Sequence, residues 1–194
     1  MNRASIAGVI LAAGASSRMG QPKALLEYEG QTFVQRLARI LDQLCGRVIV
    51  VVGFDAERVR AAVPSRAVVV ENSQPELGML SSLQCGLREA MEADAVLFLP
   101  VDHGALRPTT IAAVAAESAD AGIVVPECQG RHGHPVRVCG SIVSELLSLP
   151  PTAQARDVIR RHRDITRYVS VDDPAAISGV NRPDDYRAIV EASS

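Results

Sequence analysis

Residues 6–23 read IAGVILAAGASSRMGQPK, and this stretch decides the fold. Its first half is a short apolar run, typical of a buried β-strand, and its second half is a glycine-containing polar loop. The loop carries Arg18 and Lys23 but no acidic residue. Because a turn after a strand offers free backbone N–H groups to an anion, and cationic side chains complete the neutralisation, the stretch predicts a phosphate-binding loop. The loop therefore points to a nucleotide.

Four further apolar runs rich in β-branched residues follow, and such runs are typical of strands buried on both faces. They are residues 48–52, 67–70, 95–99 and 122–125. Amphipathic segments with helical spacing lie between them, and one stripe consists of Leu80, Leu83, Leu87 and Met91. Strand and helix alternate, which predicts an α/β fold: a three-layer α/β/α sandwich with a Rossmann-like mixed, mostly parallel sheet.

The second half of the chain is less regular. We expect a loop at 129–135 (QGRHGHP), strands at 136–139 and 166–171, and helices at 141–147, 155–163 and 183–192. The sequence contains no repeat and no linker. Its 194 residues are enough for a large core, so we expect one domain, residues 1–194.

Composition excludes several classes of protein. The formal net charge is −2, aromatic residues make up 3 % of the chain and tryptophan is absent, which is unlike a nucleic-acid-binding protein. No apolar stretch approaches the roughly 20 residues that span a bilayer, so we expect no membrane segment. The scattered cysteines form no CxxC pair and indicate reduced thiols in a cytoplasmic protein. They are Cys45, Cys85, Cys128 and Cys139.

Two common nucleotide motifs do not fit the loop. A Rossmann fingerprint needs GxGxxG, but five residues separate Gly14 from Gly20. A Walker A loop needs GK followed by Ser or Thr, but Gln21 follows Gly20. The remaining pattern, LAAGASSRMGQPKALL at 11–26, resembles the signature loop of nucleotidyltransferases with a glycosyltransferase-A-like fold, in the group that contains molybdenum cofactor cytidylyltransferase.

Four later segments carry the same resemblance. They are GMLSSLQCGL at 78–87, LPVDHG at 99–104, GRHGHPV at 130–136 and GVNRPDDY at 179–186. Together with the first loop they cover nearly the full chain in order, and the set of five favours the molybdopterin branch of the group.

The resemblance implies a reaction. It is the Mg²⁺-dependent transfer of CMP from CTP to molybdopterin cofactor with release of pyrophosphate, and a molybdenum hydroxylase would receive the product. The attacking phosphate is already ionised, so no strong general base is needed. The implied catalytic residues are Arg18, Lys23 and Asp102. The implied nucleotide-binding residues are Leu11, Ala12, Ala13, Gly14, Arg18, Lys23, Asn72, Gly78 and Ser82.

Asp102 follows a buried strand at its carboxyl end, where ligands collect in open α/β sheets. A carboxylate there suits Mg²⁺, but a helix cap or a turn explains an Asp-His-Gly sequence equally well. The resemblance favours the metal and implies Asn181 as a second ligand, at a position that is often Asp in the family. Relatives usually lack His103, which we expect to be a surface turn residue.

The base is indicated by Ala13. The form LAAG, rather than the LAGG of guanylyl-transferring relatives, favours a pyrimidine. The resemblance places Ser82 near the base, and a helix-capping role for Ser81 and Ser82 is compatible with it. Asn72 is either a base contact or a turn residue.

The acceptor side rests on weaker patterns. The resemblance implies His134 and Arg156 as acceptor-binding residues, but Arg156 and Arg160 fit a solvated helix face equally well. The cluster Cys128, His132, His134 and Cys139 raises a zinc alternative, although its spacing matches no common zinc pattern. Alternative functions are nucleotidyl transfer to a sugar or polyol phosphate, a non-catalytic molybdenum cofactor carrier, and a regulatory nucleotide-binding module.

Overall fold

The computed structural model describes residues 6–118 and 121–192. Within them, the main sheet contains β1 (Ile6–Ala12), β4 (Arg47–Val52), β5 (Val68–Glu71), β6 (Ala95–Pro100), β7 (Ile123–Cys128), β8 (Arg131–His132), β9 (Val136–Cys139) and β10 (Thr166–Ser170). A separate pair is formed by β2 (Glu27–Tyr28) and β3 (Gln31–Thr32). The helices are α1 (Phe33–Leu44), α2 (Ala56–Ala62), α3 (Met79–Glu89), α4 (Pro108–Ala116), α5 (Gly140–Ser148), α6 (Ala155–Arg161) and α7 (Pro183–Glu191).

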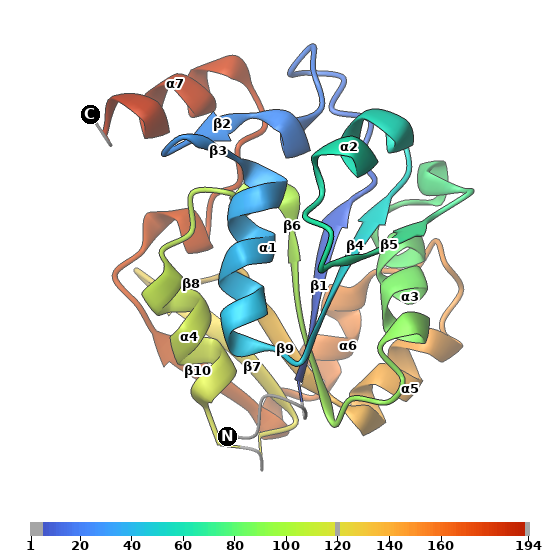
Figure 1. Cartoon of the computed structure of the whole chain (residues 1–194). Coiled ribbons are helices and arrows are strands. Elements are labelled where there is room, and N and C mark those ends of the chain that lie inside the picture. Colours follow the sequence, from blue (N-terminus) through green and yellow to red (C-terminus); the bar gives the residue numbers. More distant parts are fainter. Residues whose placement is uncertain (1–5, 119–120, 193–194) are drawn as a thin grey trace.

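The sheet is mixed and mostly parallel, as the alternation of strands and helices predicts. Its strand order is β10-β7-β9-β6-β1-β4-β5, with β8 paired to β7. The central strand β1 runs parallel to β4 and β6 on its two sides, whereas β9 is antiparallel to both β6 and β7. Helices α1, α2 and α4 cover one face and α3, α5 and α6 the other, which confirms the three-layer sandwich (Figure 1).

The opening stretch forms the centre of this sheet. All seven residues of β1 are buried, and successive side chains point to opposite faces. Ile6 and Ile10 pack in the core beneath α1 and α4, while Val9 and Leu11 pack beneath α3 and α5. A strand with a core on each side needs apolar residues at every position, and this requirement explains the continuous apolar run.

Two local predictions were wrong, and one helix was missed. Met91 lies beyond the end of α3 and is 59 % exposed, so the buried stripe ends at Leu87. The short helix α2 was missed because only Val59 of its seven residues is buried, too few to form a stripe. The segment 129–135 is not all loop, because β8 pairs with β7 inside it.

The parallel strands bring distant loops to one edge. Because β1, β4 and β6 run in the same direction, the segments that follow them lie side by side at their carboxyl ends. Helix α7 and the β2–β3 pair lie at the same end of the molecule (Figure 1). Among the described residues, no helix is long and apolar enough to cross a membrane.

Candidate functional site

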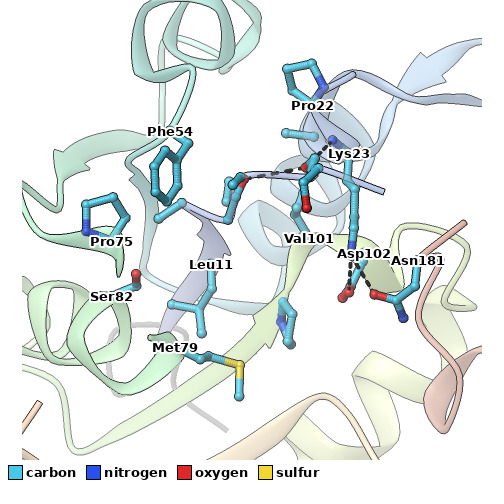
Figure 2. Close-up of a pocket in the computed structure, with 18 of the residues that line it drawn as sticks. Leu11, Pro22, Lys23, Phe54, Pro75, Met79, Ser82, Val101, Asp102 and Asn181 are labelled. Atoms are coloured by element: carbon cyan, nitrogen blue, oxygen red, sulfur yellow. Dashed lines mark hydrogen bonds and ion pairs between the residues drawn. The ribbon is translucent and has the colours of Figure 1, made fainter. Parts of the chain in front are cut away.

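A cavity of about 350 Å³ opens at the carboxyl edge of β1, β4 and β6 (Figure 2). It brings together eight of the predicted nucleotide-binding residues and both predicted metal ligands. These are Leu11, Ala12, Ala13, Gly14, Arg18, Lys23, Gly78, Ser82, Asp102 and Asn181. Four of the five segments that carry the family resemblance thus converge on one cavity, although they lie far apart along the chain.

The loop after β1 is held by its own side chains. The Ser16 hydroxyl accepts a hydrogen bond from the Lys23 backbone N–H at 3.0 Å, and Met19 is buried beneath the loop. Gly20 has a φ of +73°, a backbone conformation that favours glycine. Arg18 is exposed and forms no ion pair within the described part of the chain. Its guanidinium is therefore available to an anionic ligand.

Three segments meet at the ammonium of Lys23. Its Nζ atom donates hydrogen bonds to Asp102 Oδ2 at 3.0 Å and to Asn181 Oδ1 at 2.7 Å (Figure 2). The backbone joins them as well, because the Val180 N–H donates to the Asp102 carbonyl at 2.9 Å. Gly179 lies so close that a Cβ atom there would be 2.9 Å from Asp102 Cγ. A side chain at Gly179 would therefore disturb the carboxylate.

These donor atoms fit a divalent cation. Asp102 Oδ1 is buried and has no hydrogen-bond partner among the described residues, and Asn181 contributes a second oxygen. Carboxylate and amide oxygens are the ligands that Mg²⁺ prefers, with the remaining positions filled by water and substrate phosphates. In this structure the Lys23 ammonium bridges the two residues, so their oxygens already share a cation.

His103 is not the surface residue that the sequence suggested. It is only 8 % exposed, and its Nδ1 donates to the Ala175 carbonyl at 2.7 Å. Its Nε2 lies 4.0 Å from Asp102 Oδ1, so the ring packs behind the carboxylate. The partner Ala175 is 72 residues away along the chain, which is why local turn chemistry gave the wrong prediction.

Asn72 is not part of the cavity wall. Its side chain is 5 % exposed and lies behind Ser82, whose hydroxyl it contacts at 3.0 Å. The capping prediction for the serines was wrong, since no side chain caps α3, and Ser81 instead donates to the Gly78 carbonyl at 2.8 Å.

Two wall residues lie outside every segment that the sequence analysis singled out. Phe54 and Pro75 line the cavity at the end opposite Lys23 (Figure 2). A usable signal existed for Phe54, because it follows the strand β4 beside β1 and therefore lies at the same edge. Pro75 carried no such signal.

A second cavity, of about 790 Å³, contains both predicted acceptor residues, His134 and Arg156. Met79 lines both cavities, so the two are neighbours. Burial, together with the nearby charge of His103, lowers the pKa of His134 to about 3, so this imidazole is neutral at physiological pH. Arg160 and Arg163 add two more cations to the wall.

The zinc alternative gains no support from the structure. Cys128 and Cys139 are absent from the wall that contains His132 and His134. Across residues 6–118 and 121–192, no three His, Cys, Asp or Glu side chains gather to hold a metal ion.

The fold and the first cavity together are those of the nucleotide-binding α/β transferases. The model of the MobA-like NTP transferase domain matches residues 8–165, and the chain belongs to this family. The solved structure of Rv0371c from Mycobacterium tuberculosis H37Rv has a TM-score of 0.85 and 26 % identity, covering 98 % of this chain and 100 % of that one. A second structure of Rv0371c, a complex with manganese, has a TM-score of 0.79 and 26 % identity, covering 97 % of this chain and 99 % of that one.

Curated relatives carry more than one activity in their names. The molybdenum cofactor cytidylyltransferase of Escherichia coli (strain K12) is 25 % identical over 182 residues, 92 % of each chain. The molybdenum cofactor guanylyltransferase of Xanthomonas euvesicatoria pv. vesicatoria (strain 85-10) is 32 % identical over 111 residues, 57 % of this chain and 54 % of that one. Nicotine blue oxidoreductase of Paenarthrobacter nicotinovorans is 40 % identical over 111 residues, 55 % and 53 % of the two chains. Membership of the family therefore leaves the nucleotide and the acceptor open.

Proposed function

We propose that this chain, acting as a single cytoplasmic domain, transfers CMP from CTP to a molybdopterin-type cofactor in a Mg²⁺-dependent reaction. The observation that carries the proposal is the meeting of Lys23, Asp102 and Asn181 at the wall of the first cavity. Their atoms supply the two things that nucleotidyl transfer needs, a cation for the phosphates and oxygen ligands for a metal ion.

The residues have distinct tasks in this proposal. Arg18 and Lys23 bind the triphosphate, while Asp102 and Asn181 hold Mg²⁺, which would offset the charge that develops on the phosphates. An acceptor phosphate oxygen forms a bond to the α-phosphorus, the bond from that phosphorus to the bridging oxygen of the β-phosphate breaks, and pyrophosphate leaves with the electron pair. No step requires a general base, which agrees with the low pKa of His134 at the acceptor side, because an imidazole with a pKa of about 3 is a weak base.

The second cavity supports an anionic, ring-shaped acceptor. Arg156, Arg160 and Arg163 project cationic groups into its wall, where they would bind a phosphate. The rings of His132 and Tyr168 stack there with centroids 4.1 Å apart and planes inclined by 17°. A flat wall beside cations fits a phosphorylated pterin better than a sugar phosphate. A molybdenum hydroxylase would receive the product.

The cytosine assignment is the finer part of the proposal. Ala13 is 3 % exposed, and Gly53 lies so close to it that an added Cβ there would be 2.8 Å from the Ala13 methyl. The methyl group therefore packs into the core, and its influence on the base must act through the backbone of the loop. The relative with cytidylyltransferase in its name matches along 92 % of this chain, which supports the same choice.

The deciding experiment combines the protein, Mg²⁺ and molybdenum cofactor with each ribonucleoside triphosphate in turn and measures pyrophosphate. Release with CTP is the expected result. Release with GTP but not CTP would overturn the base, and release only when a sugar phosphate or polyol phosphate replaces the cofactor would overturn the acceptor. No release with any combination would leave a carrier, a regulatory nucleotide-binding module or the redox activity named for one relative.

A further inference from the structure

A hydrogen-bond chain behind the first cavity determines what Ser82 can offer to a ligand. It starts at the Gln74 backbone N–H, which donates to Asn72 Oδ1 at 3.0 Å. Since a backbone N–H can only donate, the oxygen of this amide must face Gln74, and the NH₂ group must face the other way. There it donates to Ser81 Oγ at 2.9 Å and to Ser82 Oγ at 3.0 Å.

The two serines respond differently to the same donor. Ser81 Oγ accepts a hydrogen bond from Asn72 and donates one to the Gly78 carbonyl at 2.8 Å. Ser81 therefore both donates and accepts inside the protein. Ser81 does not line the cavity, whereas Ser82 does.

The Ser82 hydroxyl is free to donate a hydrogen bond to a ligand. Its oxygen accepts from Asn72, and among residues 6–118 and 121–192 its hydroxyl donates no hydrogen bond. The side chain projects into the cavity at the end that also holds Phe54 and Pro75, away from the Lys23 ammonium (Figure 2). The hydroxyl group of Ser82 can therefore donate a hydrogen bond at the end of the cavity where the proposed site would hold the base rather than the phosphates.

We propose that Asn72 is a positioning residue that makes the Ser82 hydroxyl a hydrogen-bond donor to the base of the bound nucleotide. The selected base then carries an acceptor at this point, either a ring carbonyl oxygen or an unprotonated ring nitrogen. A base that presents an amino group or a ring N–H there can bond only to the remaining lone pair of Ser82 Oγ and leaves the Ser82 hydroxyl without an acceptor, so it should bind less tightly. This inference rests on the nucleotide site of the proposed function and deepens it, because it assigns the base selection to a residue that does not touch the ligand.

The test reverses the polarity of the chain with an isosteric change. In the variant Asn72→Asp one carboxylate oxygen still accepts from the Gln74 N–H, but the other now accepts the Ser82 proton, so that Ser82 turns its lone pairs to the base. Dissociation constants are measured by calorimetry for CTP, UTP, ATP, GTP and inorganic tripolyphosphate. We expect the ratio between the best and the worst triphosphate to shrink or invert by about tenfold. Tripolyphosphate has no base, so its affinity reports the general effect of the added negative charge on anion binding, and the ratios between the nucleotides report the base preference.

Three further variants complete the design. Ser82→Ala should also flatten the base preference, and Asn72→Asp added to Ser82→Ala should have no further effect on it. Ser81→Ala, which removes the neighbouring hydroxyl outside the cavity, should keep the wild-type ratios. If Asn72→Asp does not fold, Ser82→Ala alone decides.

Unchanged ratios in Ser82→Ala, or an equal shift by Asn72→Asp with and without Ser82, would overturn the inference. A wild-type chain that binds no triphosphate would instead count against the proposed function itself. If the wild type binds CTP and releases pyrophosphate, but Ser82→Ala leaves the base preference unchanged, this inference is wrong and the proposed function stands.

Discussion

The two cavities of this protein are built in opposite ways. The first is formed by the segments that follow β1, β4 and β6 and is organised by charge, with a lysine ammonium between a carboxylate and an amide oxygen. The second draws on β8, α6 and β10 and contains a half-buried imidazole that stays neutral beside exposed arginines. Parallel strands converge their loops at one edge, whereas the acceptor side needed the antiparallel strand β9 and a separate helix. The donor side is therefore the more predictable part of the molecule.

The largest expected effect concerns Asp102 on the donor side. Asp102→Ala should lower turnover by about 10³-fold, because it removes the carboxylate that would hold the metal and leaves Lys23 without its anion. Pyrophosphate release measures the effect, and a thermal melt checks that the variant is folded. Chelation of divalent cations in the wild type should have a similar effect. Near-normal turnover in Asp102→Ala would remove this residue from the metal site.

Lys23 offers a test with two opposite signs. Lys23→Met should lower turnover by about 10²-fold, since the cation that would bind the phosphates is lost. Without nucleotide, however, it should raise Mn²⁺ affinity by about tenfold, because the ammonium that bridges Asp102 and Asn181 is gone. Electron paramagnetic resonance of free Mn²⁺ gives the affinity.

Arg18→Met is the matched control for this prediction. Arg18 lines the same cavity but makes no contact with Asp102 or Asn181. It should lower turnover without raising Mn²⁺ affinity. Higher Mn²⁺ affinity in both variants would indicate a general charge effect. Unchanged Mn²⁺ affinity in both variants would contradict the bridging role of Lys23.

A smaller effect is expected at the acceptor cavity. Arg156→Ala should raise the KM for the acceptor by about tenfold and leave the KM for CTP unchanged, because one charge-assisted hydrogen bond to an anion is lost. Arg161→Ala is the comparison variant, since its guanidinium pairs with Glu145 and does not line the cavity. If the two variants behave alike, Arg156 belongs to a solvated helix face.

The last prediction concerns stability and pH rather than turnover or binding. Burial lowers the pKa of His134 from 6.5 to about 3, so the unfolded chain binds a proton that the folded chain refuses. The free energy of unfolding should therefore fall as the pH drops below 6.5, by up to about 1.4 kcal/mol per pH unit from this residue. His134→Gln should show a shallower decline in urea titrations across that range.

How well each feature could be predicted from the sequence follows the same division between the cavities. Strands β1, β4 and β6 were predictable because burial on both faces demands apolar residues at every position. The polar loop that follows β1 and lines the first cavity was predictable because its residues are contiguous. His103 was not, because its burial depends on a carbonyl far along the chain. Asn72 was placed in the nucleotide site, and the structure shows it one layer behind the wall.

The sequence by itself determined which segments are strands, that a glycine-containing polar loop follows the first of them, and which residue types are available for a cation and its ligands. Only the tertiary structure decided that Lys23 reaches Asp102, 79 residues away, and Asn181, 158 residues away. It also decided that the amide of Asn72 points its donors at Ser82. The reason is physical. Burial of a strand shows in the spacing of apolar residues that are close together in the sequence, whereas hydrogen bonds between distant side chains depend on distances of a few ångströms that only the packed sheet sets.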